Sequence, residues 1–249
     1  GLAAAAARVQ AEHADSPSAA LEFETNAASC DARAGDTKAL DALVTRLEAG
    51  TGLEVESEVE AWETVYHALS RLKNISGAEN ALQHMRKLKP EHRATLVTEE
   101  NFASLQGRAE DAFAAAHKIR ELYPYQHMGD ERLGILYGTA GDGENALAHA
   151  SRALSIAPYC HISHASGAMA YFAAGDIERA RVHMERAESL DVTETPLQWS
   201  ASTALMHALR GDREQFEACV LDRSRTIEKY SYPKFEERLR EVLEAAAST

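Results

Sequence analysis

The chain has 249 residues, of which 45% are hydrophobic and 26% charged, and this composition is typical of a globular protein with a substantial core. Its formal net charge of −13 disfavours binding to the backbone of a nucleic acid or to an anionic membrane. A partner attracted by charge is therefore expected to be neutral or basic.

The sequence lacks the marks of secretion or membrane insertion. Its first residues, GLAAAAARVQAEHADSPS, have neither a basic start nor a hydrophobic core, so they are typical of an alanine-rich helix rather than a signal peptide. No apolar run approaches the length that spans a membrane. Cys30, Cys160 and Cys219 are far apart and odd in number, which indicates a reducing compartment and predicts a cytoplasmic protein. Because the sequence begins at Gly1 rather than at a methionine, we expect it to be trimmed or part of a longer chain.

An internal period of 34 residues organises the chain. Three residue types follow this spacing independently, which indicates a repeat architecture rather than a chance pattern. Each repeat begins with an amphipathic helix, continues through a glycine-containing turn, and ends with a second helix that runs to a proline. The recurring residues are Pro90, Pro124 and Pro158; Gly107, Gly141 and Gly175; and Ala78, Ala112, Ala146 and Ala180.

The repeated alanines indicate how the helices pack. They fall where two helices approach closely, because a larger side chain would hold the axes apart. Gly211 lies 36 residues after Gly175 rather than 34, so we expect a short insertion at 193–196. In chain order, the predicted segments are an alanine-rich helical cap at 1–16, a repeat array at 17–230 with units at 21–54, 59–92, 93–126, 127–160, 161–194 and 197–230, and a capping helix at 231–249.

Residues 127–160 contain a Leu-Gly pair, then a tyrosine, two alanines and a closing proline, and in this pattern they resemble the tetratricopeptide repeat family. The unit at 59–92 also has the tryptophan of that pattern, Trp62, whereas the unit at 161–194 has His164 in its place. The resemblance implies an all-α fold, a right-handed α-solenoid of stacked antiparallel helix pairs with terminal capping helices. The residues that carry it in 127–160 are Leu133, Gly134, Tyr137, Ala146, Ala153 and Pro158.

The resemblance also implies where a partner binds. In this family the first helix of each unit lines a concave groove that holds an extended peptide or a partner's helix. Residues four apart share one face of a helix, and this spacing selects the side chains that would face the groove. The expected groove residues are Glu63, His67, Arg71, Val97, Asn101, Glu131, Ile135, Ile162, Ala165, Met169, Phe172 and Leu205.

The character of this groove set changes along the chain. Its N-terminal part is polar with mixed charge, whereas the part from Ile135 to Leu205 is mainly apolar. We therefore expect a protein or peptide partner with an apolar or amphipathic segment, bound against the C-terminal half. The alternative is that Met169 and Phe172 are covered by the chain's own neighbouring units.

Cys160, His161 and His164 place three potential metal ligands within five residues. Cys160 and His164 are four apart and would share one helical face, but a structural zinc site needs four ligands and a catalytic one usually three. No second cysteine or histidine pair lies nearby in the sequence, and the repeat places Cys160 between units and His164 at a packing position. Packing roles are therefore favoured over a metal site, and we expect no cofactor.

Three functions remain open from the sequence. The favoured one is a scaffold that binds a protein or peptide, and not an enzyme, because the chain has no GxSxG, phosphate-loop or kinase-type motif. The second is the sensory or regulatory region of a larger multidomain regulator, such as a transcription factor or signalling enzyme. The least favoured is a metal-binding protein that uses Cys160, His161 and His164. Neither nucleic-acid nor membrane binding is expected, and the sequence predicts no oligomeric state.

Overall fold

The computed structural model of the protein describes residues 2–190, 201–226 and 233–247. The regular secondary structure in these ranges is entirely α-helical. The chain divides into two compact units, residues 1–99 and residues 100–249. The insertion expected at 193–196 lies outside the described residues.

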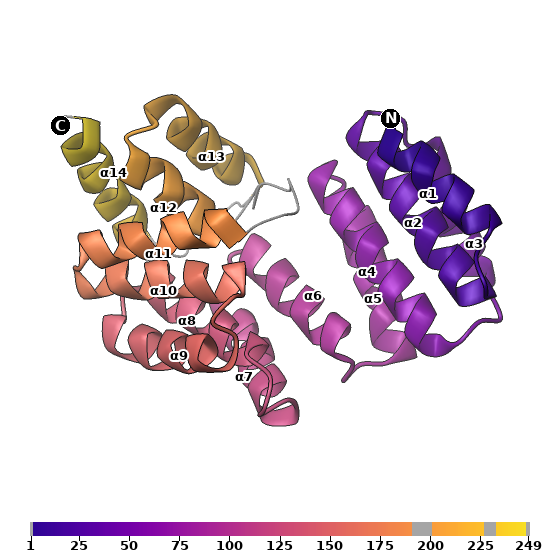
Figure 1. The fold of residues 1–249 in the computed structure, drawn as a ribbon, viewed down its shortest axis with the longest axis horizontal. Coiled ribbons are helices and arrows are strands. Elements are labelled where there is room, and N and C mark those ends of the chain that lie inside the picture. Colours follow the sequence, from indigo (N-terminus) through magenta and orange to yellow (C-terminus); the bar gives the residue numbers. More distant parts are fainter. Residues whose placement is uncertain (1, 191–200, 227–232, 248–249) are drawn as a thin grey trace. The chain divides into compact units, whose positions relative to one another are not determined.

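The first unit is built from paired helices (Figure 1). Its helix α2 packs against α1, α3 and α4, and α4 packs against α5. Two of these helices begin at polar caps, because the Ser16 side chain accepts a hydrogen bond from the Ala19 amide and that of Asn74 from the Gly77 amide. The bounds are α1 (Leu2–Glu12), α2 (Pro17–Arg33), α3 (Lys38–Ala49), α4 (Val55–Arg71) and α5 (Ile75–Leu88), followed by α6 (Arg93–Leu105), in which the unit boundary falls.

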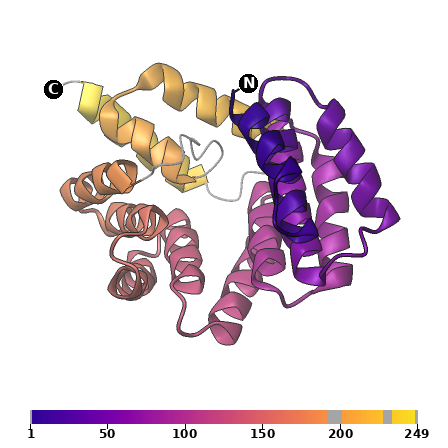
Figure 2. The same ribbon diagram turned by 45° about the vertical axis from the view of Figure 1, so that its right-hand side comes forward.

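The second unit is also built from paired helices (Figure 2). In it, α8 packs against α7, α9 and α10, and α10 packs against α8, α9 and α11. At the C-terminal end, α12 packs against both α13 and α14. The bounds are α7 (Ala109–Leu122), α8 (Met128–Ala140), α9 (Gly143–Ile156), α10 (His161–Ala174), α11 (Ile177–Leu190), α12 (Ala201–Arg210), α13 (Arg213–Thr226) and α14 (Pro233–Ala247).

The recurring glycines end the first helices. Gly141 and Gly175 follow α8 and α10 with φ angles of 82° and 90°, in the left-handed region that favours glycine. The recurring alanines lie in the interior, and Ala112, Ala146 and Ala180 are each fully buried. The all-α class and the stacking of helix pairs predicted from the repeat are thus confirmed. Among the described helices, none is both long and apolar enough to cross a membrane.

Two glycines let neighbouring first helices lie unusually close together. A Cβ atom added at Gly138 of α8 would lie 2.9 Å from the main-chain oxygen of Met169 in α10. At Gly134 it would clash with Ser166 Oγ and lie 3.3 Å from the main-chain nitrogen of Ala150 in α9. A side chain at Gly138 would therefore require a shift of the helices, and one at Gly134 would require Ser166 to change its rotamer.

Gly138→Val is expected to lower the free energy of unfolding by about 1–3 kcal/mol, because the added methyl groups meet main-chain atoms that cannot move aside. Urea denaturation followed by circular dichroism measures the change. Ala148→Val, at an exposed position of α9, is the matched control and should leave the midpoint nearly unchanged. Equal midpoints for the two variants would contradict the close approach of α8 and α10.

Candidate functional site

In the first unit, the expected groove residues lie on a partly exposed stripe of α4. Glu63, His67 and Arg71 follow one another at intervals of four and are all half-buried. Burial, followed by the positive charge of Arg33, lowers the pKa of Arg71. The stripe therefore offers mixed charge on one side of a first helix.

The remaining groove residues divide into two groups. Asn101, Ile135 and Ile162 are half-buried, so part of each side chain reaches the surface. Asn101 also accepts a hydrogen bond from the Arg132 guanidinium, which is bound to the Glu100 carboxyl as well. The buried group consists of Val97, Glu131, Ala165, Met169, Phe172 and Leu205.

Met169 and Phe172 are core residues, with 0% and 1% of their surface exposed. The Phe172 ring meets the Phe235 ring of α14 edge to face, with centroids 5.6 Å apart. The guanidinium of Arg238 lies 5.0 Å from the Phe172 centroid and donates a hydrogen bond to the main-chain oxygen of Ala173. The expectation that these side chains face a partner is therefore corrected, because the chain's own α12 and α14 complete their packing.

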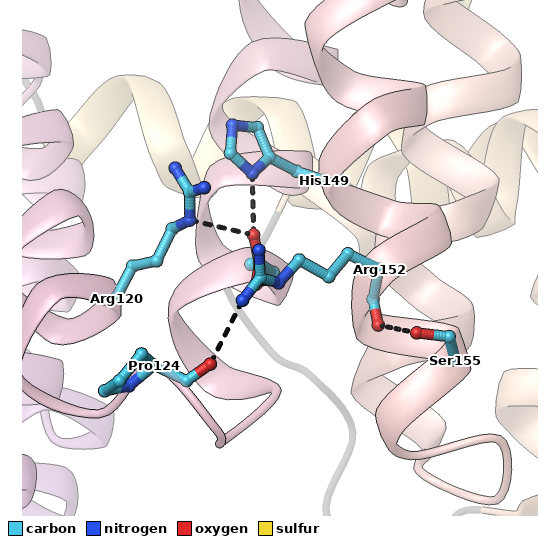
Figure 3. Close-up of polar contacts among 6 residues, drawn as sticks. Arg120, Pro124, His149, Arg152 and Ser155 are labelled. Carbon is cyan, nitrogen blue, oxygen red and sulfur yellow. Dashed lines mark hydrogen bonds and ion pairs between the residues drawn. The ribbon is translucent and has the colours of Figure 1, made fainter.

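The first turn of α8 carries two consecutive buried acidic residues, Asp130 and Glu131, and each lies in a different polar cluster. Asp130 is surrounded by basic side chains, and its carboxyl oxygens lie 2.8 Å from His149 Nδ1, 3.4 Å from Arg120 Nε and 3.0 Å from Arg152 Nε. Figure 3 shows these three side chains converging from α7 and α9. Two permanent positive charges compensate this buried acid, and Asp130 thereby ties three helices together.

Glu131 meets neutral or titratable groups instead. Its Oε1 atom accepts a hydrogen bond from Ser163 Oγ at 2.6 Å and one from Cys160 Sγ at 3.1 Å, and it lies 3.6 Å from His127 Nε2. Burial, followed by the carboxyl of Glu131, raises the pKa of the Cys160 thiol. Cys160 thus lacks the electropositive surroundings that activate a cysteine nucleophile.

The structure separates Cys160 from His164. Among the described residues, the ligand atoms that converge with Cys160 Sγ belong to His127 and Glu131, and neither His161 nor His164 is part of that group. His127 and Ser163 were not identified as site residues from the sequence, although the spacing between His127 and Cys160 indicates that these two could lie close together. His127 precedes Cys160 by 33 residues, about one repeat period, and stacked repeats bring such positions together.

His164 forms a pair with His183 of α11. Their Nδ1 atoms are 3.1 Å apart, and His164 Nε2 lies 3.1 Å from the main-chain oxygen of Pro158. Because that oxygen only accepts, Nε2 of His164 donates the hydrogen bond to it, and the two Nδ1 atoms then share the remaining contact between the rings. The Tyr171 ring stacks on His183 with centroids 5.2 Å apart, so the half-buried pair is part of the packing between α10 and α11.

This histidine pair predicts a loss of stability in mild acid. Burial, followed by the charge of His164, lowers the pKa of His183. The folded protein then binds fewer protons than the unfolded chain, so the stabilisation is complete above the unfolded histidine pKa of about 6.5 and is lost as the pH falls toward the lower folded value. Urea titrations over this pH range should give a smaller fall in unfolding free energy for His183→Gln than for the unchanged protein. An identical fall in both would exclude His183 as a source.

Among comparisons with known proteins, the similarity to a solved structure identifies the fold. No protein-family model matches the sequence, and no curated protein matches it. A tetratricopeptide repeat protein from Parabacteroides merdae is 18% identical in sequence and superimposes with a TM-score of 0.57, over 98% of this chain and 91% of that one. A MamA structure from MSR-1 is also 18% identical, with a TM-score of 0.43 over 70% of this chain and 98% of that one. The chain therefore has the fold of the tetratricopeptide repeat proteins.

Proposed function

We propose that the protein is a scaffold without catalytic activity, and that it binds a segment of another protein on the surface of its first helices. The observation that carries this proposal is the docking of α14 on first-helix side chains of the same chain. The fold, which stacks helix pairs so that one helix of each pair forms a common layer, supports the same function.

Helix α14 shows what kind of segment fits this layer. Phe235, Leu239 and Leu243 recur every four residues and are at most 5% exposed, so they form one apolar face. This face packs with Phe172 of α10 and with Leu205 of α12 in a single hydrophobic cluster. An amphipathic helix with apolar residues at the same spacing is therefore the partner that the layer would accept, in the helix-in-groove manner.

The surface proposed for the partner lies on the first helices of the second unit, where Ile135 and Ile162 keep exposed area and supply apolar contacts. The polar stripe of α4, in which Glu63 and Arg71 supply charge of both signs, is proposed separately as a binding surface of the first unit. The net charge of −13 favours a partner that is neutral or basic outside its apolar face.

A photocrosslinking experiment with the full chain tests the proposal. A photoreactive residue is placed at Ile135 or Ile162 on first helices of the second unit, and at the exposed positions Ser151 of α9 and Glu178 of α11 as controls. In native extract, the first-helix positions should capture one and the same protein, and the second-helix positions should not. Equal capture from all positions, or none from the first helices, would overturn the proposed surface.

The docking of α14 has its own test. Leu239→Glu places an unpaired charge in an apolar cluster, which costs several kcal/mol, so amide exchange in α14 is expected to accelerate by about a hundredfold or more. Hydrogen exchange read by mass spectrometry measures this for α14 and for the C-terminal end of α10. Glu237→Ala, at an exposed position of α14, is the control and should exchange as the unchanged protein does. Unaltered protection in Leu239→Glu would show that the apolar face does not hold α14 in place.

A further inference from the structure

Asp130 and Glu131 are adjacent in sequence and equally buried, with 1% and 2% of their surface exposed, yet their charges are compensated differently. Successive residues of an α-helix point about 100° apart, so the two side chains reach different neighbours. Asp130 is bound by Arg120 and Arg152. No lysine or arginine of the described residues forms an ion pair with Glu131, and His127 is the one basic group in contact with it.

A buried carboxylate without a fixed positive partner is costly, and a bound cation removes that cost. The groups around Glu131 are metal ligands rather than salt-bridge partners. One ligand atom each from His127, Glu131 and Cys160 lies within 4.8 Å of the other two. Two of these separations are already short, at 3.1 Å between Cys160 Sγ and Glu131 Oε1 and 3.6 Å between His127 Nε2 and Glu131 Oε1.

These distances fit a shared ion. Zinc binds cysteine sulfur at about 2.3 Å and histidine nitrogen or carboxylate oxygen at about 2.0–2.2 Å, so ligand atoms around one tetrahedral ion lie roughly 3–4 Å apart. A contraction of about 1 Å or less therefore brings all three atoms into the coordination sphere. His127 and Cys160 hold the positions just before α8 and α10, and neither side chain caps its helix. Both are thus available to turn toward Glu131.

We propose that His127, Glu131 and Cys160 form a Zn²⁺ site that joins the beginnings of α8 and α10. The ligand types select the ion, because thiolate and imidazole suit zinc, whereas calcium and magnesium require oxygen ligands throughout. Three protein ligands leave a fourth position for water. On binding, the Cys160 thiol releases its proton to solvent as the zinc–sulfur bond forms. Ser163 donates a hydrogen bond to the Glu131 carboxylate and thereby fixes the orientation of that ligand.

The test uses the full chain without a histidine tag. Co²⁺ is added first as a spectroscopic probe, because a thiolate bound to Co²⁺ gives an intense near-ultraviolet charge-transfer band. Zn²⁺ alone is then added to displace it, and competition with a chromophoric chelator gives the zinc dissociation constant. We expect one equivalent of Co²⁺, a charge-transfer band, and loss of that band when one equivalent of Zn²⁺ is added.

Substitutions assign the ligands. Cys160→Ser should abolish the charge-transfer band, and Glu131→Gln and His127→Asn should each weaken zinc binding by more than Ser163→Ala, which is expected to cost about tenfold. Cys30→Ser, Cys219→Ser and His161→Asn are matched controls that remove the same side-chain types outside the cluster. These controls should bind as the unchanged protein does.

A melting experiment guards against variants that merely fail to fold. Bound zinc stabilises the folded state by mass action, so Zn²⁺ should raise the melting temperature of the unchanged protein and of the three controls, but not that of Cys160→Ser. Absence of saturable binding, a band that survives Cys160→Ser, or an equal loss in the His161→Asn control would each overturn the site. A Cys160→Ser variant that is folded without metal and insensitive to Zn²⁺ supports it.

Discussion

The close approach of neighbouring first helices is the constraint on which the second unit depends. The glycine faces of α8 leave no room for a Cβ atom against Ser166 and the main chain of Met169. Because α8 and α10 lie this close, side chains about one repeat period apart come into contact, as Glu131 does with Cys160 and Ser163. The Glu131 cluster is thus a consequence of small-residue packing, and a bulkier interface would have kept its groups apart.

Much of the fold can be predicted from the sequence, because helix ends are determined by local residues. A glycine can adopt the left-handed conformation that ends a helix, and a proline cannot continue one. Gly141 and Gly175 behave in this way, and the buried alanines at the same period lie where helices touch. Because these signals repeat at a fixed interval, the pattern in one unit supports the same prediction of helices in the next.

The site residues were less predictable, because burial depends on segments that are distant in the chain. The residues near Phe172 in the sequence do not predict that Phe235 and Arg238 cover its ring. The helical spacing correctly grouped Glu63, His67 and Arg71 on one stripe, but the same spacing cannot distinguish a partner-facing position from one covered by a returning helix. Likewise, the local run Cys160, His161 and His164 drew attention to sequence neighbours, whereas the convergent ligand atoms come from the beginnings of two different helices, α8 and α10.

Repeat proteins commonly behave as one-dimensional stacks, in which each unit is stabilised by its immediate neighbours and the ends fray first. The bond from Arg238 to the carbonyl of Ala173 spans 65 residues and links the last helix to a first helix two pairs back. Such a link stabilises α14 through a contact with a helix pair that is not its immediate neighbour. The unfolding of α14 and of α10 should therefore be coupled, because α14 is held by a first helix that is not its immediate neighbour in the stack.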